Sequence, residues 1–183
     1  PTSIQSGDTI ELDCGRTYRG PLVLTGLSSV SVRTRGDCGL ASLTTATPVS
    51  GWQRDPKHAA VWVARLDVMP SQLQLGTRFM ALAHHPNTPG TWLTGDSIVA
   101  GQLRTRLPSA DLAGATLVWR AADWLIEARR ILRYDGQTMT IAPAASDSFG
   151  LPAHPAFYVE GKRWMLDSPG EWVHEAGKLS LWT

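Results

Sequence analysis

The sequence has little of what marks several classes of protein. No apolar run approaches the roughly 20 residues that a membrane-spanning helix needs. The 17 basic and 16 acidic residues leave a net charge of +1, which gives no bulk attraction to nucleic acid or to an anionic membrane. Charged residues make up 18% and hydrophobic residues 43% of the 183, a balance that excludes disorder and fits one globular domain or two small ones. We therefore expect neither nucleic acid nor a membrane as a partner.

Cysteine is scarce as well. The two cysteines, Cys14 and Cys38, occur in similar phrases, Asp-Cys-Gly in both cases. Their spacing matches no zinc motif, and two thiols alone make a poor metal site. Two interpretations remain open: a disulfide, which implies a secreted or periplasmic protein, or two buried free thiols. We expect the disulfide.

Lysine, tyrosine and phenylalanine are also few. The chain has 3 Lys against 14 Arg, and 3 Tyr and 3 Phe against 8 Trp. Tryptophan in such a chain either fills the core between thin β-layers or stacks against the apolar face of a sugar ring. Composition alone leaves both roles open.

Convincing helical periodicity is missing too, and the segment 1–50 shows strand and turn patterns. Short strand-like runs alternate with Gly-rich turns. The apolar pair Ile10 and Leu12 recurs as Val30 and Val32, and Leu22 recurs at nearly the same spacing as Leu43. A period of about 20 in short strands predicts a solenoid in which coils stack on one another. A bridge from Cys14 to Cys38 would then join neighbouring coils.

From residue 51 onward the pattern is that of antiparallel strands. Residues 72–83 predict a hairpin that turns at Gly76, and residues 84–92 read as a loop from their Pro, Asn and Gly content. Residues 109–113 fit one helical turn capped by Ser109. Residues 121–132 suit a strand with a break near Arg129, and Asp135-Gly136 predicts a tight turn. A last hairpin follows over residues 172–182.

Two phrases in the chain resemble those of a known group of proteins. Residues 7–12 with Gly15 to Tyr18 resemble the opening coil of right-handed parallel β-helix proteins that act on polysaccharides. The phrase Leu-Asp-Ser-Pro-Gly-Glu-Trp at 166–172 is similar to one in β-helix glycosidases of the β-xylosidase and α-fucosidase type. In place of His84 or His85 that group often has Arg.

The resemblance implies a fold and a domain order. The expected fold is all-β, the start of a right-handed parallel β-helix with an inserted antiparallel β-sandwich or jelly-roll-like domain. Residues 1–50 would form the first coils, residues 51–155 the inserted sandwich, and residues 156–183 the hairpin that returns to the β-helix. In such enzymes the catalytic carboxylates lie on later coils, so this chain is expected to be inactive alone and to hold no catalytic residue.

Other chemistry finds little support in the sequence. Glycoside hydrolysis needs two carboxyl groups facing one bond; Glu171 beside Pro169-Gly170 is better explained as an acceptor of turn N–H groups, and Asp167 is interpreted in the same way. On a regular strand His84 and His85 would face opposite ways, whereas in a loop both could face one metal ion. The other histidines are isolated in the sequence, and we expect no metal site and no cofactor. The run of Arg129, Arg130 and Arg133 either binds a uronate or forms a solvated strand edge.

We therefore expect the N-terminal scaffold of a secreted polysaccharide-processing protein, a glycoside hydrolase or else a lyase or epimerase. Its partners would be an oligosaccharide or polysaccharide and the rest of the β-helix in the same parent chain. His84, His85, Asn87 and Trp92 are the expected substrate-binding residues, because they lie in one aromatic and polar loop. The alternatives are a non-catalytic carbohydrate-binding or adhesion module and a solenoid fragment with no ligand.

Overall fold

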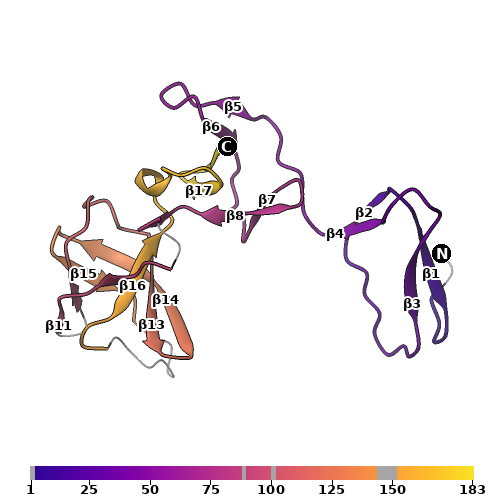
Figure 1. Ribbon diagram of the computed structural model, residues 1–183, viewed down its shortest axis with the longest axis horizontal. Helices are drawn as coiled ribbons and strands as arrows, with labels where there is room; N and C mark the ends of the chain where they lie inside the picture. Colours follow the sequence, from indigo (N-terminus) through magenta and orange to yellow (C-terminus); the bar gives the residue numbers. More distant parts are fainter. Residues whose placement is uncertain (1–2, 88–89, 100–101, 144–151) are drawn as a thin grey trace. The chain divides into compact units, whose positions relative to one another are not determined.

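The computed structural model describes residues 3–87, 90–99, 102–143 and 152–183 (Figure 1). The chain divides into two compact units, Pro1–Pro48 and Val49–Thr183. Both units are built from strands and turns, and the described residues contain one helical turn, the 3₁₀ helix η1 (Arg163–Met165). The expectation of an all-β chain is confirmed, whereas the helical turn predicted at residues 109–113 is wrong: that segment is irregular.

The first unit consists of two pairs of parallel strands. Strand β1 (Thr9–Asp13) pairs with β3 (Ser31–Arg35), and β2 (Thr17–Arg19) pairs with β4 (Ser42–Thr44). Ile10 is opposite Val32 rather than Val30, and Leu43 is opposite Tyr18 rather than Leu22. The stacking of successive turns was predicted, but the register inferred from the sequence was wrong, because apolar residues recur at more than one spacing.

A disulfide joins the two turns of the first unit. Cys14 and Cys38 are bonded, with their Cα atoms 5.3 Å apart, which confirms the predicted bridge. Gly36 has φ +96°, and a Cβ atom there would lie 2.8 Å from the Cys14 sulfur. This position therefore requires glycine for both its backbone conformation and its space.

Register also brings opposite charges together across the first unit. Glu11 lies opposite Arg33, and the Arg33 Nη2 to Glu11 Oε1 distance is 2.6 Å. At the end of the same strand pair, Asp13 forms an ion pair with Arg35. These pairs are on the surface, where ion pairs contribute little to stability, so they favour this register more than they stabilise the unit.

None of residues 3–48 is buried. Instead, several apolar side chains of the unit are open to solvent, among them Val23 at 72% and Leu40 at 85% exposure. The two strand pairs of this unit therefore enclose no buried core among residues 3–48.

In the second unit, one sheet has six strands. Its order is β5 (Gln53–Arg54), β6 (Val61–Arg65), β18 (Lys178–Trp182), β17 (Glu171–Glu175), β8 (Arg78–Leu82) and β7 (Leu73–Leu75). All neighbours are antiparallel except β17 and β8. The predicted hairpins at Gly76 and at residues 172–182 are both present, the second closing through Ala176 and Gly177 with positive φ at both, as a type I′ turn requires.

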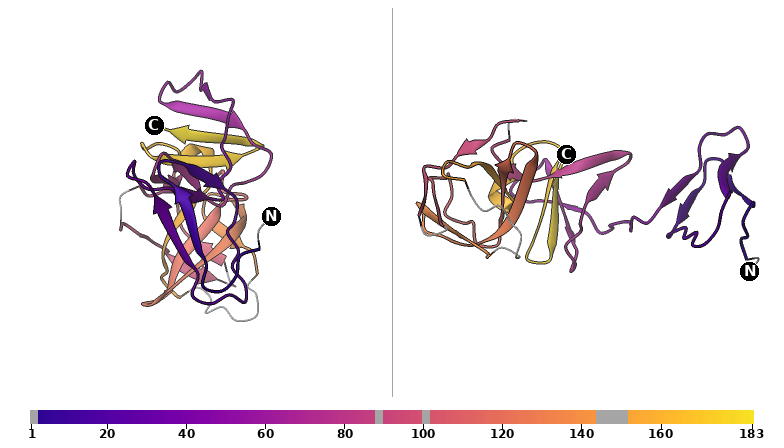
Figure 2. Two further views of the ribbon diagram at one scale, coloured as in Figure 1. Left: turned by 90° about the vertical axis from the view of Figure 1, so that its right-hand side faces the viewer. Right: turned by 90° about the horizontal axis from the view of Figure 1, so that it is seen from below.

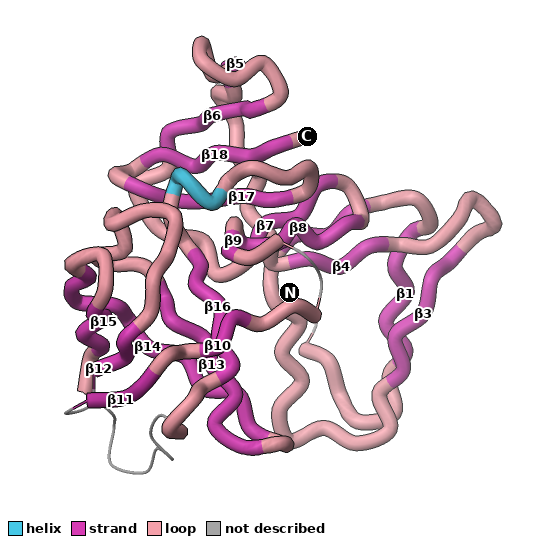
Figure 3. Tube along the Cα trace, turned by 60° about the vertical axis from the view of Figure 1, so that its left-hand side comes forward, coloured by secondary structure: helices cyan, strands magenta, loops and turns pink. Residues whose placement is uncertain are grey.

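A curled sheet of eight strands makes up the rest of the second unit (Figures 2 and 3). Its order is β10 (Leu93–Thr94), β16 (Ala156–Glu160), β13 (Thr116–Ala122), β14 (Leu125–Tyr134), β15 (Thr138–Ile141), β12 (Gln102–Arg104) and β11 (Ser97–Val99), with β9 (His84–His85) also paired to β16. The strand predicted over residues 121–132 lies mainly in β14, which runs on past Arg129 without the expected break and has a register irregularity at residues 131–133. Residues 156–160, grouped in the sequence analysis with the returning hairpin, pair as β16 with β13.

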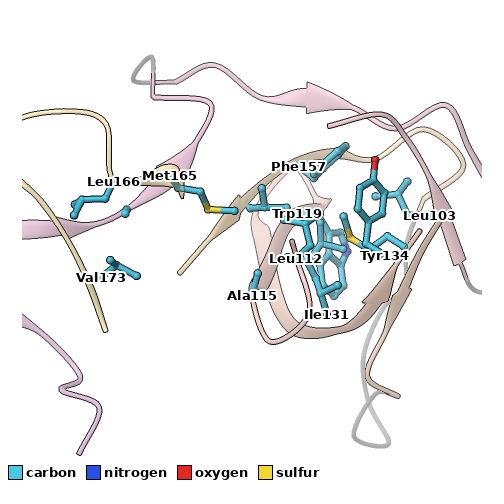
Figure 4. Packing of buried hydrophobic residues seen from close by; sticks show 14 of the residues in the cluster. Leu103, Leu112, Ala115, Trp119, Ile131, Tyr134, Phe157, Met165, Leu166 and Val173 are labelled. Atoms are coloured by element: carbon cyan, nitrogen blue, oxygen red, sulfur yellow. The ribbon is translucent and has the colours of Figure 1, made fainter. Parts of the chain in front are cut away.

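The main core lies inside the curled sheet and extends to the six-stranded one. Trp119, Phe157 and Leu103 have no exposed surface, and Met165 from η1 lies between this cluster and Val173 of β17 (Figure 4). A second cluster packs Trp172, Leu179 and Leu181 against Leu73 and Met80. Trp119 and Trp172 are thus core residues, as one of the two interpretations of the tryptophans predicted.

Candidate functional site

The expected substrate-binding residues belong to a segment whose two ends, β9 and β10, pair with one strand of the curled sheet, β16. The paired strand β9 lies beside the end of β16, with His84 opposite Glu160 and His85 opposite Val159. Strand β10 lies beside the start of β16, with Leu93 opposite Phe157. Asn87 and Trp92 lie in the chain between β9 and β10. Because β9 and β10 both pair with β16, Trp92 lies close to β16 again.

Three rings meet on the side of β16 that faces away from the core. The Trp92 and Tyr158 rings have centroids 5.2 Å apart at an interplanar angle of 68°, and the His84 and Tyr158 rings are 6.0 Å apart at 69°. Both are edge-to-face arrangements, which aromatic pairs favour. All three side chains are partly exposed, so the cluster offers ring edges and faces to a ligand.

The ring of His84 is held by two acceptors. Its Nδ1 lies 3.0 Å from the Leu82 carbonyl oxygen and 3.1 Å from Glu171 Oε1. Because a carbonyl and a carboxylate accept but do not donate, the proton of the neutral ring belongs on Nδ1. Nε2 of this tautomer carries a lone pair and can accept a hydrogen bond.

Glu171 is the buried anchor of this arrangement, with 3% of its surface exposed. Its Oε2 accepts hydrogen bonds from the backbone N–H groups of Asp167 at 3.3 Å and Ser168 at 3.2 Å. Its Oε1 accepts one from the backbone N–H of His84 at 3.4 Å. Burial raises the pKa of Glu171, against the lowering effect of these donors. The prediction that Glu171 accepts turn N–H groups is confirmed.

His85 points away from its neighbour, as alternation along a strand requires. Its ring lies 5.5 Å from that of Trp164, and burial lowers the pKa of His85, an effect that the nearby Asp167 opposes. The described residues contain no group of three or more His, Cys, Asp or Glu side chains arranged to hold a metal ion.

Asn87 ties its loop to the turn before β17. Its Nδ2 donates to Ser168 Oγ at 2.8 Å and to Asp167 Oδ1. The Asp167 carboxylate thus bonds to the Asn87 side chain, whereas the sequence analysis assigned it to turn amides. The four expected residues therefore divide: His84 and Trp92 join the ring cluster, and His85 and Asn87 support the loop from the other side.

Three residues of this region were missed by the sequence analysis: Tyr158, Glu160 and Arg120. Burial raises the pKa of Tyr158, helped by the Glu160 charge, so its phenol stays protonated and can donate a hydrogen bond. Burial likewise raises the pKa of Glu160, although the His84 charge opposes it. The alternation in residues 156–160 predicts that Tyr158 and Glu160 share a face, but nothing local links that face to Trp92.

The side chains of the ring cluster are suited to binding a ligand rather than to hydrolysing a glycosidic bond. Hydrolysis of a glycosidic bond needs two carboxyl groups across that bond. In the part of the chain that the structure describes, Glu160 is the carboxyl group on the ring side, whereas both oxygens of Glu171 are engaged by backbone donors. Partly exposed rings flanked by a carboxylate and a phenol are instead the groups that contact sugar rings and hydroxyls.

A separate groove of about 970 Å³ lies along β5, β6 and β18. Charged residues of both signs line it, and Arg163 pairs there with Asp55 at 2.7 Å. It contains none of the expected substrate-binding residues.

The fold of this chain is similar to part of one solved structure. A solved structure described as "Glycoside hydrolase" matches this chain with a TM-score of 0.70 and 18% sequence identity, over 96% of this chain and 36% of that one. At such identity the likeness concerns the fold, and this chain spans about a third of the length of that protein. No protein-family model and no curated protein matches the sequence.

Two further findings bear on where the protein works. The disulfide fits an oxidising compartment, outside the cell or in a periplasm. Within the described ranges, no helix has the length and apolar character to cross a membrane.

Proposed function

We propose that this chain is the N-terminal portion of a secreted or periplasmic polysaccharide-processing protein, a glycoside hydrolase built on a right-handed parallel β-helix. In this proposal the chain supplies scaffold and one wall of the substrate cleft. The catalytic carboxylates belong to later coils of the same parent protein. The fold shared with a much longer glycoside hydrolase supports this division of labour.

The observation that carries the proposal is the construction of the first unit. In its parallel pairs β1–β3 and β2–β4, each strand lies beside the equivalent strand of the next turn, as in successive coils of a solenoid. Each coil of a solenoid buries its apolar face against its neighbours. The exposed Val23, Leu40 and Leu43 therefore need a covering surface, and further coils of the parent chain supply one of matching shape.

The domain order follows the same logic. Residues 1–50 are the first coils, and the sandwich is inserted from residue 51. The expected boundary at residue 155 is moved in this proposal, because β16 pairs with β13 inside the curled sheet. The return to the solenoid then begins after β16 and runs through η1 into the β17–β18 hairpin.

The wall of the cleft is the ring cluster. His84 and Trp92 contact the sugar together with Tyr158, while His85 and Asn87 fix the loop that carries Trp92. Glu171 acts as a positioning residue, because it holds His84 through Nδ1.

The parent protein tests this assignment. Reducing-sugar release from a panel of plant and bacterial polysaccharides is measured for the full-length protein and for this chain alone. We expect turnover by the full-length protein and none by the chain. Trp92→Ala in the full-length protein should raise KM, whereas the matched Trp124→Ala, at a site 74% exposed on the β13–β14 turn, should leave KM unchanged. Turnover by the isolated chain would overturn the proposal.

A non-catalytic carbohydrate-binding module is the second candidate. It is favoured by the second unit having cores of its own beneath the ring cluster, so that the cluster does not depend on further coils. The length of the parent gene separates the two: many more coils with paired carboxylates favour the enzyme, and a stop codon near residue 183 favours the module.

A further inference from the structure

The outer face of the curled sheet carries an arginine beside the ring cluster. We use "outer face" for His84, Trp92, Arg120, Tyr158 and Glu160. In β13, Trp119 is fully buried and Arg120 is exposed, so Arg120 points to the outer side. Trp119–Phe157 is the last pair between β13 and β16, and the next residues along are Arg120 in β13 and Ala156 in β16.

Arg120, like Arg54 over Trp62, contacts an aromatic ring rather than a carboxylate. Ion pairs to carboxylates are formed by Arg33, Arg35, Arg65, Arg129 and Arg163. Within the described part of the chain, Arg120 has no carboxylate at ion-pair distance. Its Cζ atom lies 5.7 Å from the centroid of the Trp92 ring, within the range of a cation–π contact.

A guanidinium held against an indole is prepared to bind a carboxylate. The ring restricts the side chain, while the N–H donors at the edge of the guanidinium stay free to bind two carboxylate oxygens at once. A sugar bearing a carboxylate, a uronate, presents this anion next to an apolar ring face. Trp92 and Tyr158 stand beside Arg120 to contact that ring, and the protonated Tyr158 can donate to a hydroxyl.

The outer face carries opposite charges at its two ends, which would orient a charged ligand bound there. Glu160 and Ala156 occupy opposite ends of β16, roughly 14 Å apart at about 3.4 Å per residue. An anionic group is attracted to the Arg120 end and repelled from the Glu160 end, where a hydroxyl would bind instead. Arg130 shares the Glu160 end two strands away, but its guanidinium lies toward Gly114: Nη2 is 3.4 Å from where a Cβ atom of that residue would be.

We propose that the outer face binds a uronate residue of an acidic oligosaccharide, with its carboxylate on Arg120 and its ring against Trp92 and Tyr158. The inference rests on the proposed cleft role of the ring cluster and names the class of sugar that the cluster takes.

Calorimetric titration of this chain with a uronate trisaccharide and with its methyl ester tests the inference. We expect the acid to bind at least about tenfold more tightly than the ester. Arg120→Gln should abolish the difference, and Arg120→Lys should restore only part of it, because an ammonium cannot bind the carboxylate bidentately. Arg104→Gln, at an exposed arginine on β12, is the matched control and should change nothing.

The outcomes separate this inference from the proposed function. Equal affinity for acid and ester, or tight binding of a neutral trisaccharide alone, would overturn the uronate assignment and leave the cleft role standing. An Arg104→Gln effect as large as that of Arg120→Gln would overturn it too, since it would indicate general charge attraction. Absence of binding to every acidic and neutral glycan, with circular dichroism showing folded protein, would remove the cleft role as well.

Discussion

Each of the two units of this chain is stabilised internally in a different way. In the first, none of residues 3–48 is buried, and two parallel strand pairs are joined by one disulfide and by surface ion pairs. In the second, two hydrophobic clusters lie within and between two sheets. The first unit thus depends on a covalent bond, which limits the unfolded chain, where the second depends on buried apolar surface.

The difference has consequences for the edges and surfaces of each unit. The first unit leaves Val23 and Leu40 exposed, and its strands can accept a further pairing partner. The second unit shields its largest core side chains and carries the partly exposed ring cluster on β16. One unit is therefore unfinished as a folded body, and the other has a core beneath the surface that we assign to sugar binding.

The largest expected effect tests the core of the second unit. Phe157→Ala removes a fully buried ring beside Trp119 and should lower the free energy of unfolding of this unit by about 3–5 kcal/mol. Hydrogen exchange followed by mass spectrometry should show faster exchange throughout β13–β16 and unchanged exchange in residues 3–48. Equal acceleration in both units would mean that they fold as one.

The next effect tests the first unit. Replacing both cysteines, with Cys14→Ser and Cys38→Ser together, removes a crosslink between positions separated by 24 in the sequence and should destabilise the unit by about 3 kcal/mol. Because that unit has no core, we expect limited proteolysis to degrade it while the second unit resists. Reduction of the wild-type disulfide should reproduce the result, and a first unit that stays protected without its crosslink would contradict this account.

The smallest effect concerns a carboxyl group of the second unit and depends on pH. Burial raises the pKa of Glu160, so its favourable contribution is complete below the unfolded pKa and is lost as pH rises through the folded one. Glu160→Gln should therefore raise Tm at neutral pH, with the gain shrinking in acid. A gain that is the same at every pH would show that the burial of charge is not its cause.

Asp135→Asn is the matched control, with the opposite sign. Backbone N–H donors from Thr138 and Gln137 lower the pKa of the exposed Asp135. Its contribution is present above the unfolded pKa and disappears as pH falls through the folded one, so this variant should lower Tm at neutral pH and approach wild type in acid.

Local features of the sequence were enough for the hairpin turns and the longer strands, but not for the short strands β9 to β12. Asp135-Gly136, Gly76 and Ala176-Gly177 sit where the hairpins close, since these turns need residues that tolerate positive φ or bond to their own backbone. The spacing of Cys14 and Cys38, which matches no zinc motif, favoured the bridge over two free thiols, and the structure confirms it. The register of β1 against β3 could not be predicted in this way. Val30 and Val32 lie on the same face of a strand, so the apolar pattern alone does not decide which of them pairs with Ile10.

The candidate site shows the same limit. The aromatic and polar character of residues 84–92 was visible in the sequence, but the orientation of His84 and His85 was not, because the segment was expected to be a loop and His84–His85 form a strand. Nothing local indicated that Trp92 would return to β16 and meet Tyr158, or that Glu171 would reach the distant His84. Those contacts come from strand pairing.

The sequence by itself determined the all-β class, the hairpin turns and the lack of bulk charge, because each depends on residue type and short spacing, and it favoured the disulfide. Only the tertiary structure decided which strands neighbour one another, and with that the ring cluster, the burial of Glu171 and the place of Arg120 beside Trp92. The physical reason is that strand pairing is non-local: its partners are chosen by packing over the whole sheet.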